Sequence, residues 1–332
     1  MAEDIKDPKV TILMPVYNGE RYLREAIVSM LNQTFTNFEF LIINDGSTDG
    51  SEAIIKSYND KRIRLVNNEK NLGIVETLNK GIGLAKGEYI ARMDCDDISL
   101  PERLEKQVKV LDENPAVALV ATQFEMMDGH DLELGIWPSG IKIKTPAEIR
   151  RRMPAENCIA HPAAMGRKKI LENYPYRKTQ QGAEDWDLWL NLLSEGFIIS
   201  KVDEVLLRYR VHEESVTLKR NKRSPYINKG RTLWKYVLYR ITALRFNLYD
   251  VRVLIYAKIN YLKHLLFLIH SRLPVFAEKI FKTNPLSIAG ILFKVTFWFG
   301  KDAGLFLFIS DKADKVNCDK LIRLAYERHG VI

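Results

Sequence analysis

Cysteine is scarce in this sequence of 332 residues, and the three that occur are far apart: Cys95, Cys158 and Cys318. They form no C-x-x-C pair, which argues against a disulfide scaffold and against a cysteine-rich zinc site. A reducing cytoplasm is therefore the compartment that we expect for this protein.

Long hydrophobic runs are also missing. A helix that crosses a membrane needs roughly 18 uninterrupted apolar residues. The nearest candidate, residues 286–309, is interrupted by Lys294, Lys301 and Asp302. The first residues show no basic segment followed by an apolar one, so we expect neither a secretory signal nor a membrane-spanning helix.

Acidic residues are nearly absent from residues 216–300, which contain sixteen Lys or Arg but only Asp250 and Glu278. The whole chain carries a net charge of +8, so its positive charge is concentrated here. This shift in composition predicts two parts: a domain over residues 1–215, and a mainly helical, basic and aromatic C-terminal region over residues 216–332.

The basic stretch also contains many Tyr, Phe and Trp residues and apolar runs such as residues 265–269 and 291–293. Basic side chains beside aromatic ones suit the headgroup layer of an anionic membrane. Nucleic acid is the competing partner, but these apolar runs exceed what phosphate binding requires. We therefore expect peripheral membrane contact and no nucleic acid, while an ordinary helical domain with a solvated basic face explains the pattern equally well.

Residues 9–122 alternate between strand and helix patterns. Repeated βα units of this kind predict a mostly parallel sheet with helices on both faces, which is an α/β fold. The predicted strands cover residues 10–14, 38–43, 63–66, 88–93 and 117–121, and the predicted helices cover residues 20–33, 49–57, 74–85 and 101–114. Asp49 and Glu52 have the spacing of a capping box for the second helix.

Polar and glycine-rich segments follow the first two predicted strands. Residues 15–20 read PVYNGE and residues 44–49 read NDGSTD. In a parallel sheet, ligands bind at the carboxyl ends of the strands. Tyr17 suits stacking on a nucleobase, and Asp45 suits accepting a hydrogen bond from that base or from a ribose hydroxyl, although two ordinary polar turns would have the same composition.

Three carboxylates occur within four residues after the fourth strand, at Asp94, Asp96 and Asp97. Like charges at this density require a counter-ion or raised pKa values. Carboxylate oxygens on a short loop suit Mg²⁺ or Mn²⁺, which such sites share with the phosphates of a substrate. We prefer this interpretation to a solvated acidic turn.

Together, these segments resemble the family 2 glycosyltransferases of GT-A fold over residues 8–215. The matching segments are PVYN (15–18), NDGSTD (44–49), NLG (71–73), GEY (87–89), DCDD (94–97) and ED (184–185). The resemblance implies an inverting, metal-dependent transferase with a GT-A (Rossmann-like) sheet and a nucleotide-sugar donor, UDP-hexose being the expected one.

The resemblance also implies roles for single residues. Those matching Pro15, Tyr17, Asp45 and Asn71 would hold the nucleotide of the donor. Asp94 and Asp96 would serve the diphosphate and the divalent metal, Mn²⁺ or Mg²⁺. We further expect Arg92 to contact the diphosphate and His212 to complete the metal shell, although a surface histidine fits His212 nearly as well.

The family's catalytic base corresponds to Asp185, which would take a proton from the acceptor hydroxyl. Glu184 and Asp187 lie next to it, so the sequence alone leaves the choice of base open, and we place Glu184 among the substrate-binding residues. Trp186, Leu188 and Trp189 are expected to pack in the core. His161 stays outside the catalytic set because a single histidine beside a proline is weak evidence.

Processive synthases carry a Gln-x-x-Arg-Trp motif that is absent after Asp185. The expected reaction is therefore the transfer of one sugar to a glycan or lipid-linked acceptor in cell-surface polysaccharide synthesis, at the cytoplasmic face of the membrane. Nucleotidyl transfer is disfavoured because the chain has no glycine-rich, arginine-containing N-terminal loop. A non-catalytic nucleotide-sugar or nucleic-acid binding module is the alternative.

Overall fold

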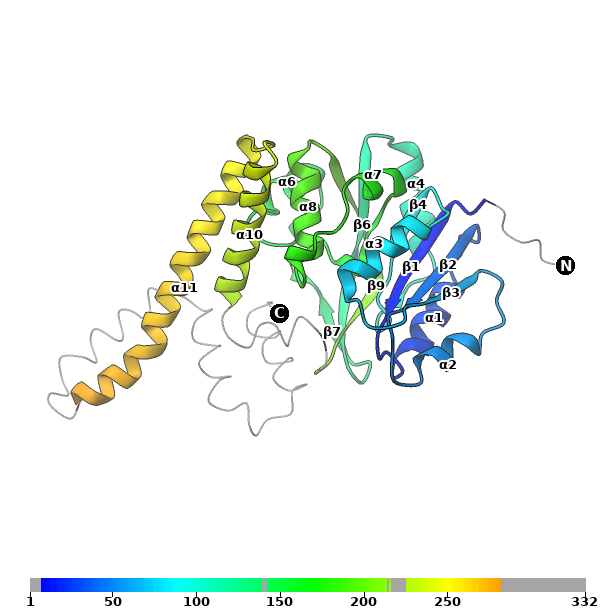
Figure 1. Cartoon of the computed structure of the whole chain (residues 1–332), viewed down its shortest axis with the longest axis horizontal. Helices are drawn as coiled ribbons and strands as arrows, with labels where there is room; N and C mark the ends of the chain where they lie inside the picture. The colour runs from blue at the N-terminus through cyan, green and yellow to red at the C-terminus, as the bar shows by residue number, and fades with distance from the viewer. Residues whose placement is uncertain (1–6, 139–141, 214, 216–224, 282–332) are drawn as a thin grey trace. The chain divides into compact units, whose positions relative to one another are not determined.

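The computed structural model describes residues 7–138, 142–213, 215 and 225–281 (Figure 1). Cys318 and the apolar segments at 286–309 lie outside the described residues. The strands are β1 Val10–Val16, β2 Phe38–Asn44, β3 Ile63–Asn67, β4 Tyr89–Arg92, β5 Ile98–Ser99, β6 Val117–Asp128, β7 Glu133–Ile136, β8 Met165–Arg167 and β9 Ile198–Val211. The helices are α1 Leu23–Leu31, α2 Ser51–Lys56, α3 Ile74–Leu84, α4 Arg103–Glu113, α6 Pro146–Arg152, α7 Lys168–Asn173, α8 Glu184–Ser194, α10 Pro225–Thr242 and α11 Leu248–Phe281.

The described strands form one mixed sheet in the order β3-β2-β1-β4-β8-β6-β9-β5, with β7 paired to β6. Strands β3, β2, β1 and β4 are parallel, as predicted. The short strand β8 then runs antiparallel between β4 and β6, and β9 pairs with β6 in parallel. Every residue of β1 and β2 is buried. Their mostly apolar sequences are typical of strands that are covered on both faces.

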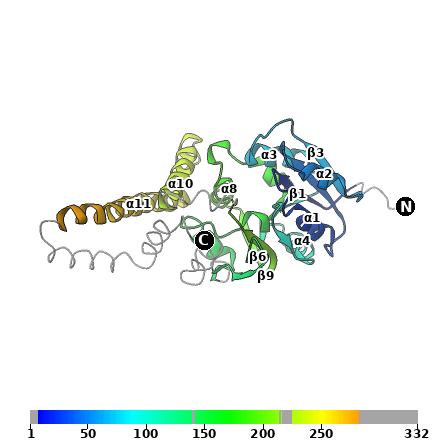
Figure 2. The same cartoon turned by 90° about the horizontal axis from the view of Figure 1, so that it is seen from below.

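Helices cover both faces of the sheet, as the alternating pattern predicts. Figure 2 shows β1 between α3 on one side and α1 and α4 on the other. The third helix approaches the strands closely, because a Cβ placed on Gly81 would lie only 2.3 Å from Leu13 Cδ1. Trp186, Leu188 and Trp189 of α8 are buried, which confirms their predicted place in the core.

The structure corrects two local predictions about helix starts. Asp49 does not form a capping box with Glu52, since Gly50 is the N-cap of α2 and Asp49 Oδ1 accepts from the Ser51 backbone N–H (3.0 Å). Asp49 also accepts a hydrogen bond from the Glu20 backbone N–H (3.0 Å) and so ties together the loops after β1 and β2. Pro101 precedes the first turn of α4, which begins at Arg103.

The chain divides into two compact units. The first comprises the residues up to Val211 together with Leu238–Asp250, and the second comprises the remaining residues. The end of α10 and the start of α11 thus belong to the unit that contains the sheet. A functional domain boundary at residue 215 stays a prediction. No helix of the described residues is both long enough and apolar enough to cross a membrane.

Candidate active site

The loops after β1 and β2 are joined by reciprocal hydrogen bonds. The Asn18 N–H donates to Ser47 Oγ (3.0 Å), and the Thr48 N–H donates to Asn18 Oδ1 (2.8 Å). Pro15 is buried in β1, whereas the ring of Tyr17 is about half exposed just beyond the strand. Tyr17 therefore stands at the rim of a surface that both loops build.

Asp45 organises the third loop, which contains Asn71. Its buried carboxylate accepts hydrogen bonds from Asn68 Nδ2 (2.7 Å) and from the backbone N–H groups of Leu72 (2.9 Å) and Gly73 (2.9 Å). This loop also touches the second one, because a Cβ on Gly46 would lie 2.7 Å from the Asn71 backbone nitrogen. Gly46 has a φ of +70°, which glycine adopts without strain.

The acidic segment after β4 contacts the first loop. A Cβ on Gly19 would lie 2.9 Å from Cys95 Sγ. Arg92 is buried at the end of β4 and forms an ion pair with Asp94. Burial raises the pKa of Asp94, the charges of Asp96 and Asp185 raise it further, and Arg92 opposes them. Asp94 and Asp185 thus lie close enough to interact electrostatically.

The first turn of α8 carries three acids with different surroundings. Asp185 is half-buried and accepts a hydrogen bond from Asn157 Nδ2 (2.7 Å). Glu184 accepts from the Gly182 N–H (2.5 Å), and burial together with the charge of Asp185 raises the pKa of Glu184 to about 7. Asp187 forms a two-pronged ion pair with Arg177 and is buried.

The segment between α7 and α8 is held to α3 by hydrogen bonds. Asn79 of α3 and the Tyr176 backbone exchange two hydrogen bonds of 2.9 Å. The Tyr176 hydroxyl bonds His161 Nε2 at 2.7 Å, and both side chains are buried. Burial, followed by the charge of Arg92, lowers the pKa of His161 well below 6.5, so this histidine is a neutral core residue.

The acidic segment fits a divalent cation. One oxygen from each of Asp94, Asp96 and Asp97 lies within 4.8 Å of the others. Asp97 Oδ2 is buried and has no hydrogen-bond partner among the described residues. Burial, followed by the charges of Asp96 and Asp94, raises the pKa of Asp97 well above its usual value. Hard carboxylate oxygens are the ligands that Mg²⁺ and Mn²⁺ prefer.

One predicted ligand falls outside this cluster. His212 belongs to the second unit, where its backbone N–H donates to Ser215 Oγ (3.1 Å). Its role at the metal stays a prediction. Pro15, Tyr17, Asp45, Asn71, Arg92, Asp94, Asp96, Glu184 and Asp185 all belong to the first unit.

Known proteins of similar sequence identify the family of this chain. The family model described as glycosyl transferase family 2 matches residues 11–175. An uncharacterized glycosyltransferase of Methanocaldococcus jannaschii, MJ1057, is 34% identical over 242 residues, covering 71% of this chain and 82% of that protein. The chain belongs to glycosyltransferase family 2.

Two further proteins are similar to this family 2 enzyme. The O-antigen biosynthesis glycosyltransferase WbnJ of Escherichia coli is 33% identical over 212 residues, or 62% of this chain and 81% of WbnJ. The mannosyltransferase PcManGT of Pyrobaculum calidifontis, solved with GDP-Man and Mn²⁺, aligns with a TM-score of 0.60 at 18% identity over 98% of this chain and 89% of that one. This second likeness confirms the GT-A fold.

Three polar residues near the acids of this glycosyltransferase were not predicted from the sequence. Asn157 and Arg177, which hold Asp185 and Asp187, come from segments without a recognisable motif. Arg210 of β9 is buried, donates its backbone N–H to Asp97 Oδ1 (2.8 Å) and donates Nε to the Asp96 carbonyl (2.8 Å). Its position in the RYRVH segment after the last matching block is the only signal that the sequence offered.

Proposed function

We propose that this glycosyltransferase transfers a single sugar from a nucleoside diphosphate donor, expected to be a UDP-hexose, to a glycan or lipid-linked acceptor with inversion at the anomeric carbon. The supporting observation is the cluster of Asp94, Asp96 and Asp97 after the parallel strand β4, in which one oxygen of each residue lies within 4.8 Å of the others. Asp185, in the first turn of α8, is near enough for its charge to raise the pKa of Asp94. A donor-binding group and a base are both needed at one reaction centre.

The donor would lie on the joined loops after β1, β2 and β3. Pro15, Tyr17, Asp45 and Asn71 would contact its nucleotide, and Arg92 and Asp94 its ribose and diphosphate. Asp45 holds the Asn71 loop through two backbone N–H groups, so the loop has a defined conformation before a nucleotide arrives. Such preorganisation lowers the entropic cost of binding.

Asp185 would act as the general base. As the acceptor oxygen forms its bond to the anomeric carbon, the hydroxyl proton passes to the Asp185 carboxylate, and the electron pair of the broken bond leaves with the diphosphate. Asn157 orients this carboxylate by its hydrogen bond. Glu184 would contact the substrate beside it. The ion pair of Asp187 with Arg177, which engages both carboxylate oxygens, supports Asp185 rather than Asp187 as the base.

Asp94 and Asp96 would hold a divalent cation, Mn²⁺ or Mg²⁺, with His212 as the further predicted ligand. When bound, the cation would neutralise charge that develops on the leaving diphosphate. Arg92 would hold Asp94 in place through the ion pair. Buried Arg210, bonded to both Asp96 and Asp97, would support the rest of the cluster.

The likeness to an O-antigen enzyme supports a role in cell-surface polysaccharide synthesis. The basic, aromatic C-terminal region supports peripheral contact with the inner face of an anionic membrane, where a lipid-linked acceptor would be available. The donor sugar is set by a few hydroxyl contacts, so a panel of donors identifies it best.

The test is sugar transfer or donor hydrolysis by the purified full chain with UDP-, GDP- and dTDP-sugars, with and without Mn²⁺ or Mg²⁺. We expect release of nucleoside diphosphate that stops when the metal is chelated. Asp185→Asn should lower the rate by about 10²- to 10⁴-fold with unchanged donor binding. Asp203→Asn is the matched control, because that carboxylate is half exposed and pairs with Lys144.

Three outcomes would contradict the proposal. Release of pyrophosphate would indicate nucleotidyl transfer. An unchanged rate in Asp185→Asn would show that Asp185 is not the base. Salt-dependent binding of RNA or DNA without turnover of any donor would favour a binding module.

A further inference from the structure

Helix α11 carries apolar side chains on two opposite faces. Within the second unit, Val253, Ala257 and Asn260 are buried and lie on one face. The neighbouring helix α10 packs closely in this unit, because a Cβ on Gly230 would lie 3.4 Å from the Tyr261 ring. This inner face explains why α11 needs some apolar residues, but it accounts for only one side of the helix.

The outer face of α11 is formed by Val251, Ile255, Ile259 and Leu262. Their spacings of four, four and three residues place them in one stripe, roughly opposite the buried face at about 100° of rotation per residue. They are exposed by 38%, 51%, 39% and 57%, respectively. A surface helix that packs on one side normally presents polar residues on the other. An exposed apolar stripe in that position is typical of a face that contacts a partner.

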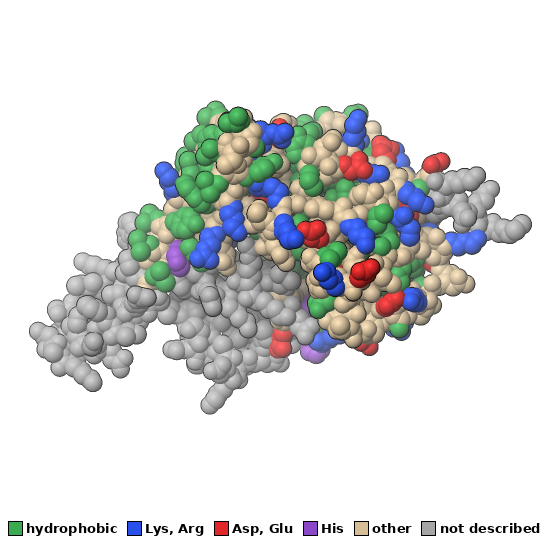
Figure 3. All heavy atoms as spheres, in the orientation of Figure 1, with side chains coloured by type: hydrophobic (Ala, Val, Ile, Leu, Met, Phe, Trp, Pro, Cys, Tyr) green, Lys and Arg blue, Asp and Glu red, His purple; other side chains and the backbone are tan. Residues whose placement is uncertain are grey.

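Basic residues border the stripe. Arg252 and Lys263 fall on one side of it and Lys258 on the other by the same helical geometry, and all three are exposed. The only acidic residue between positions 225 and 265 is Asp250, which is fully buried and paired with Arg240. Figure 3 shows hydrophobic side chains gathered over α10 and α11, with Lys and Arg among them.

The apolar stripe and its basic borders together indicate which kind of partner this face binds. A second copy of the chain would bring two basic borders together, and like charges facing each other disfavour that pairing. Nucleic acid would use the basic residues but leave the apolar stripe in water. An anionic lipid surface matches both the apolar stripe and its basic borders, because acyl chains cover the stripe and the long basic side chains reach the headgroups.

We propose that the outer face of α11 binds the surface of an anionic lipid bilayer. This inference rests on the proposed function, which includes a membrane contact, and narrows that contact to one helix face. The helix would lie in the headgroup layer with Ile255 and Ile259 directed to the acyl boundary.

The experiment measures co-sedimentation of the full chain with vesicles of phosphatidylcholine alone or mixed with phosphatidylglycerol. We expect binding to the mixed vesicles that weakens as salt rises. The double variant Ile255→Gln/Ile259→Gln should bind at least about tenfold more weakly. The triple variant Arg252→Gln/Lys258→Gln/Lys263→Gln should lose about a hundredfold, since each basic residue contributes roughly fivefold near an anionic surface.

Two control variants match these changes in the first unit. Val28→Gln/Leu84→Gln replaces two apolar side chains, of α1 and α3, that are exposed by 44% and 36%. Arg24→Gln/Lys109→Gln/Lys169→Gln removes the same charge from exposed positions. Both should bind vesicles as the unchanged chain does. Circular dichroism and thermal unfolding verify that every variant folds.

Several results would overturn the proposal: equal binding to phosphatidylcholine alone, equal weakening in the controls, or unchanged binding in the stripe variant. A stripe variant that instead dissociates an oligomer in sedimentation velocity would assign the face to a second copy. Release of nucleoside diphosphate, measured without vesicles, separates the two hypotheses. Turnover without vesicle binding would contradict only the proposed lipid-binding face. Vesicle binding without turnover would contradict only the proposed transferase reaction.

Discussion

At the scale of residues, three acids in one helical turn have three different environments. Asp187 is fixed by Arg177, whose guanidinium also lies 3.6 Å from the centroid of the Tyr239 ring. Asp185 has an amide donor and remains half-buried, so it stays accessible to a substrate hydroxyl. Their neighbour Glu184 is buried beside a like charge, which is the condition that raises a carboxyl pKa.

Glu184 makes the stability of the protein depend on pH. Its folded pKa of about 7 lies above the ordinary value of 4.5, so the folded chain holds a proton that the unfolded chain has lost between these values. The free energy of unfolding therefore falls as the pH rises through this window. Glu184→Gln should stabilise the protein by about 1 to 3 kcal/mol at pH 8 and change little at pH 4.

Urea denaturation at both pH values measures this effect. Glu204→Gln, at an exposed glutamate of β9, is the control and should show little pH-dependent gain. An equal change of stability for Glu184→Gln at both pH values would mean that the Glu184 carboxyl has the same pKa in the folded and the unfolded chain.

At the scale of elements, α3 shows how two glycines of one helix serve different purposes. A Cβ on Gly81 would meet Leu13 Cδ1 at 2.3 Å and Ile43 Cδ1 at 3.0 Å, and both neighbours are buried in the sheet. A Cβ on Gly83 would meet nothing within 4 Å. Only Gly81 is needed for the close approach of α3 to β1 and β2, which carry the first two loops of the site.

Alanine substitutions separate the two glycines. Alanine favours a helix interior by about 1 kcal/mol over glycine, whereas overpacking a core costs about 1 to 3 kcal/mol. Gly83→Ala should therefore raise the free energy of unfolding by up to about 1 kcal/mol, and Gly81→Ala should lower it. Chemical denaturation of both variants checks this, and a stabilising Gly81→Ala would show that Leu13 can move aside.

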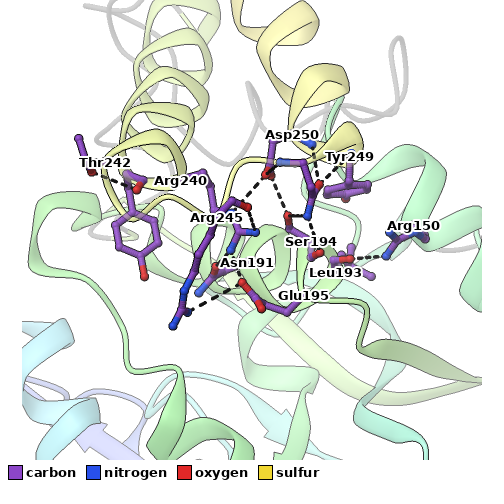
Figure 4. A network of polar contacts seen from close by, with 12 residues as sticks. Arg150, Asn191, Leu193, Ser194, Glu195, Arg240, Thr242, Arg245, Tyr249 and Asp250 are labelled. Carbon is purple, nitrogen blue, oxygen red and sulfur yellow. Dashed lines mark hydrogen bonds and ion pairs between the residues drawn. The ribbon is translucent and has the colours of Figure 1, made fainter.

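At the scale of the whole molecule, the segment 238–250 returns to the sheet-containing unit and is anchored on α8 (Figure 4). Arg240, almost fully buried, forms ion pairs with Glu195 and with Asp250. Asp250 also accepts from Ser194 Oγ (2.8 Å), and Arg240 Nη1 donates to Asn191 Oδ1 (3.1 Å). The helix that begins with Glu184 and Asp185 is thus fixed at its far end by this segment.

Removing Arg240 should be costly, because Asp250 would be left buried without its cation. Arg240→Met is expected to lower the free energy of unfolding by about 3 to 5 kcal/mol, and a second change, Asp250→Asn, should recover part of it. Arg208→Met, which breaks a half-exposed pair with Glu125, should cost less than about 1 kcal/mol. Thermal and urea unfolding compare these variants, and equal losses for Arg240→Met and Arg208→Met would contradict the anchoring role.

The parallel half of the fold, and the loops that follow its strands, could be predicted from the amino-acid sequence alone. Apolar runs such as β1 and β2 have no other stable place than a covered sheet, and the carboxyl ends of parallel strands share one edge. Tyr17, Asp45 and Asp94 follow such strands, so their common position at this edge could be predicted without coordinates. The matching motifs then indicated the family.

The pairing of polar groups from distant segments became known from the folded structure. The sequence left the base open among Glu184, Asp185 and Asp187, and the side chains that give Asp185 and Asp187 different environments, Asn157 and Arg177, come from distant segments. It likewise gave no sign that β8 enters the sheet antiparallel, or that residues 238–250 return to α8. Local periodicity reports burial along one element, whereas ion pairs and strand insertions depend on where the rest of the chain packs.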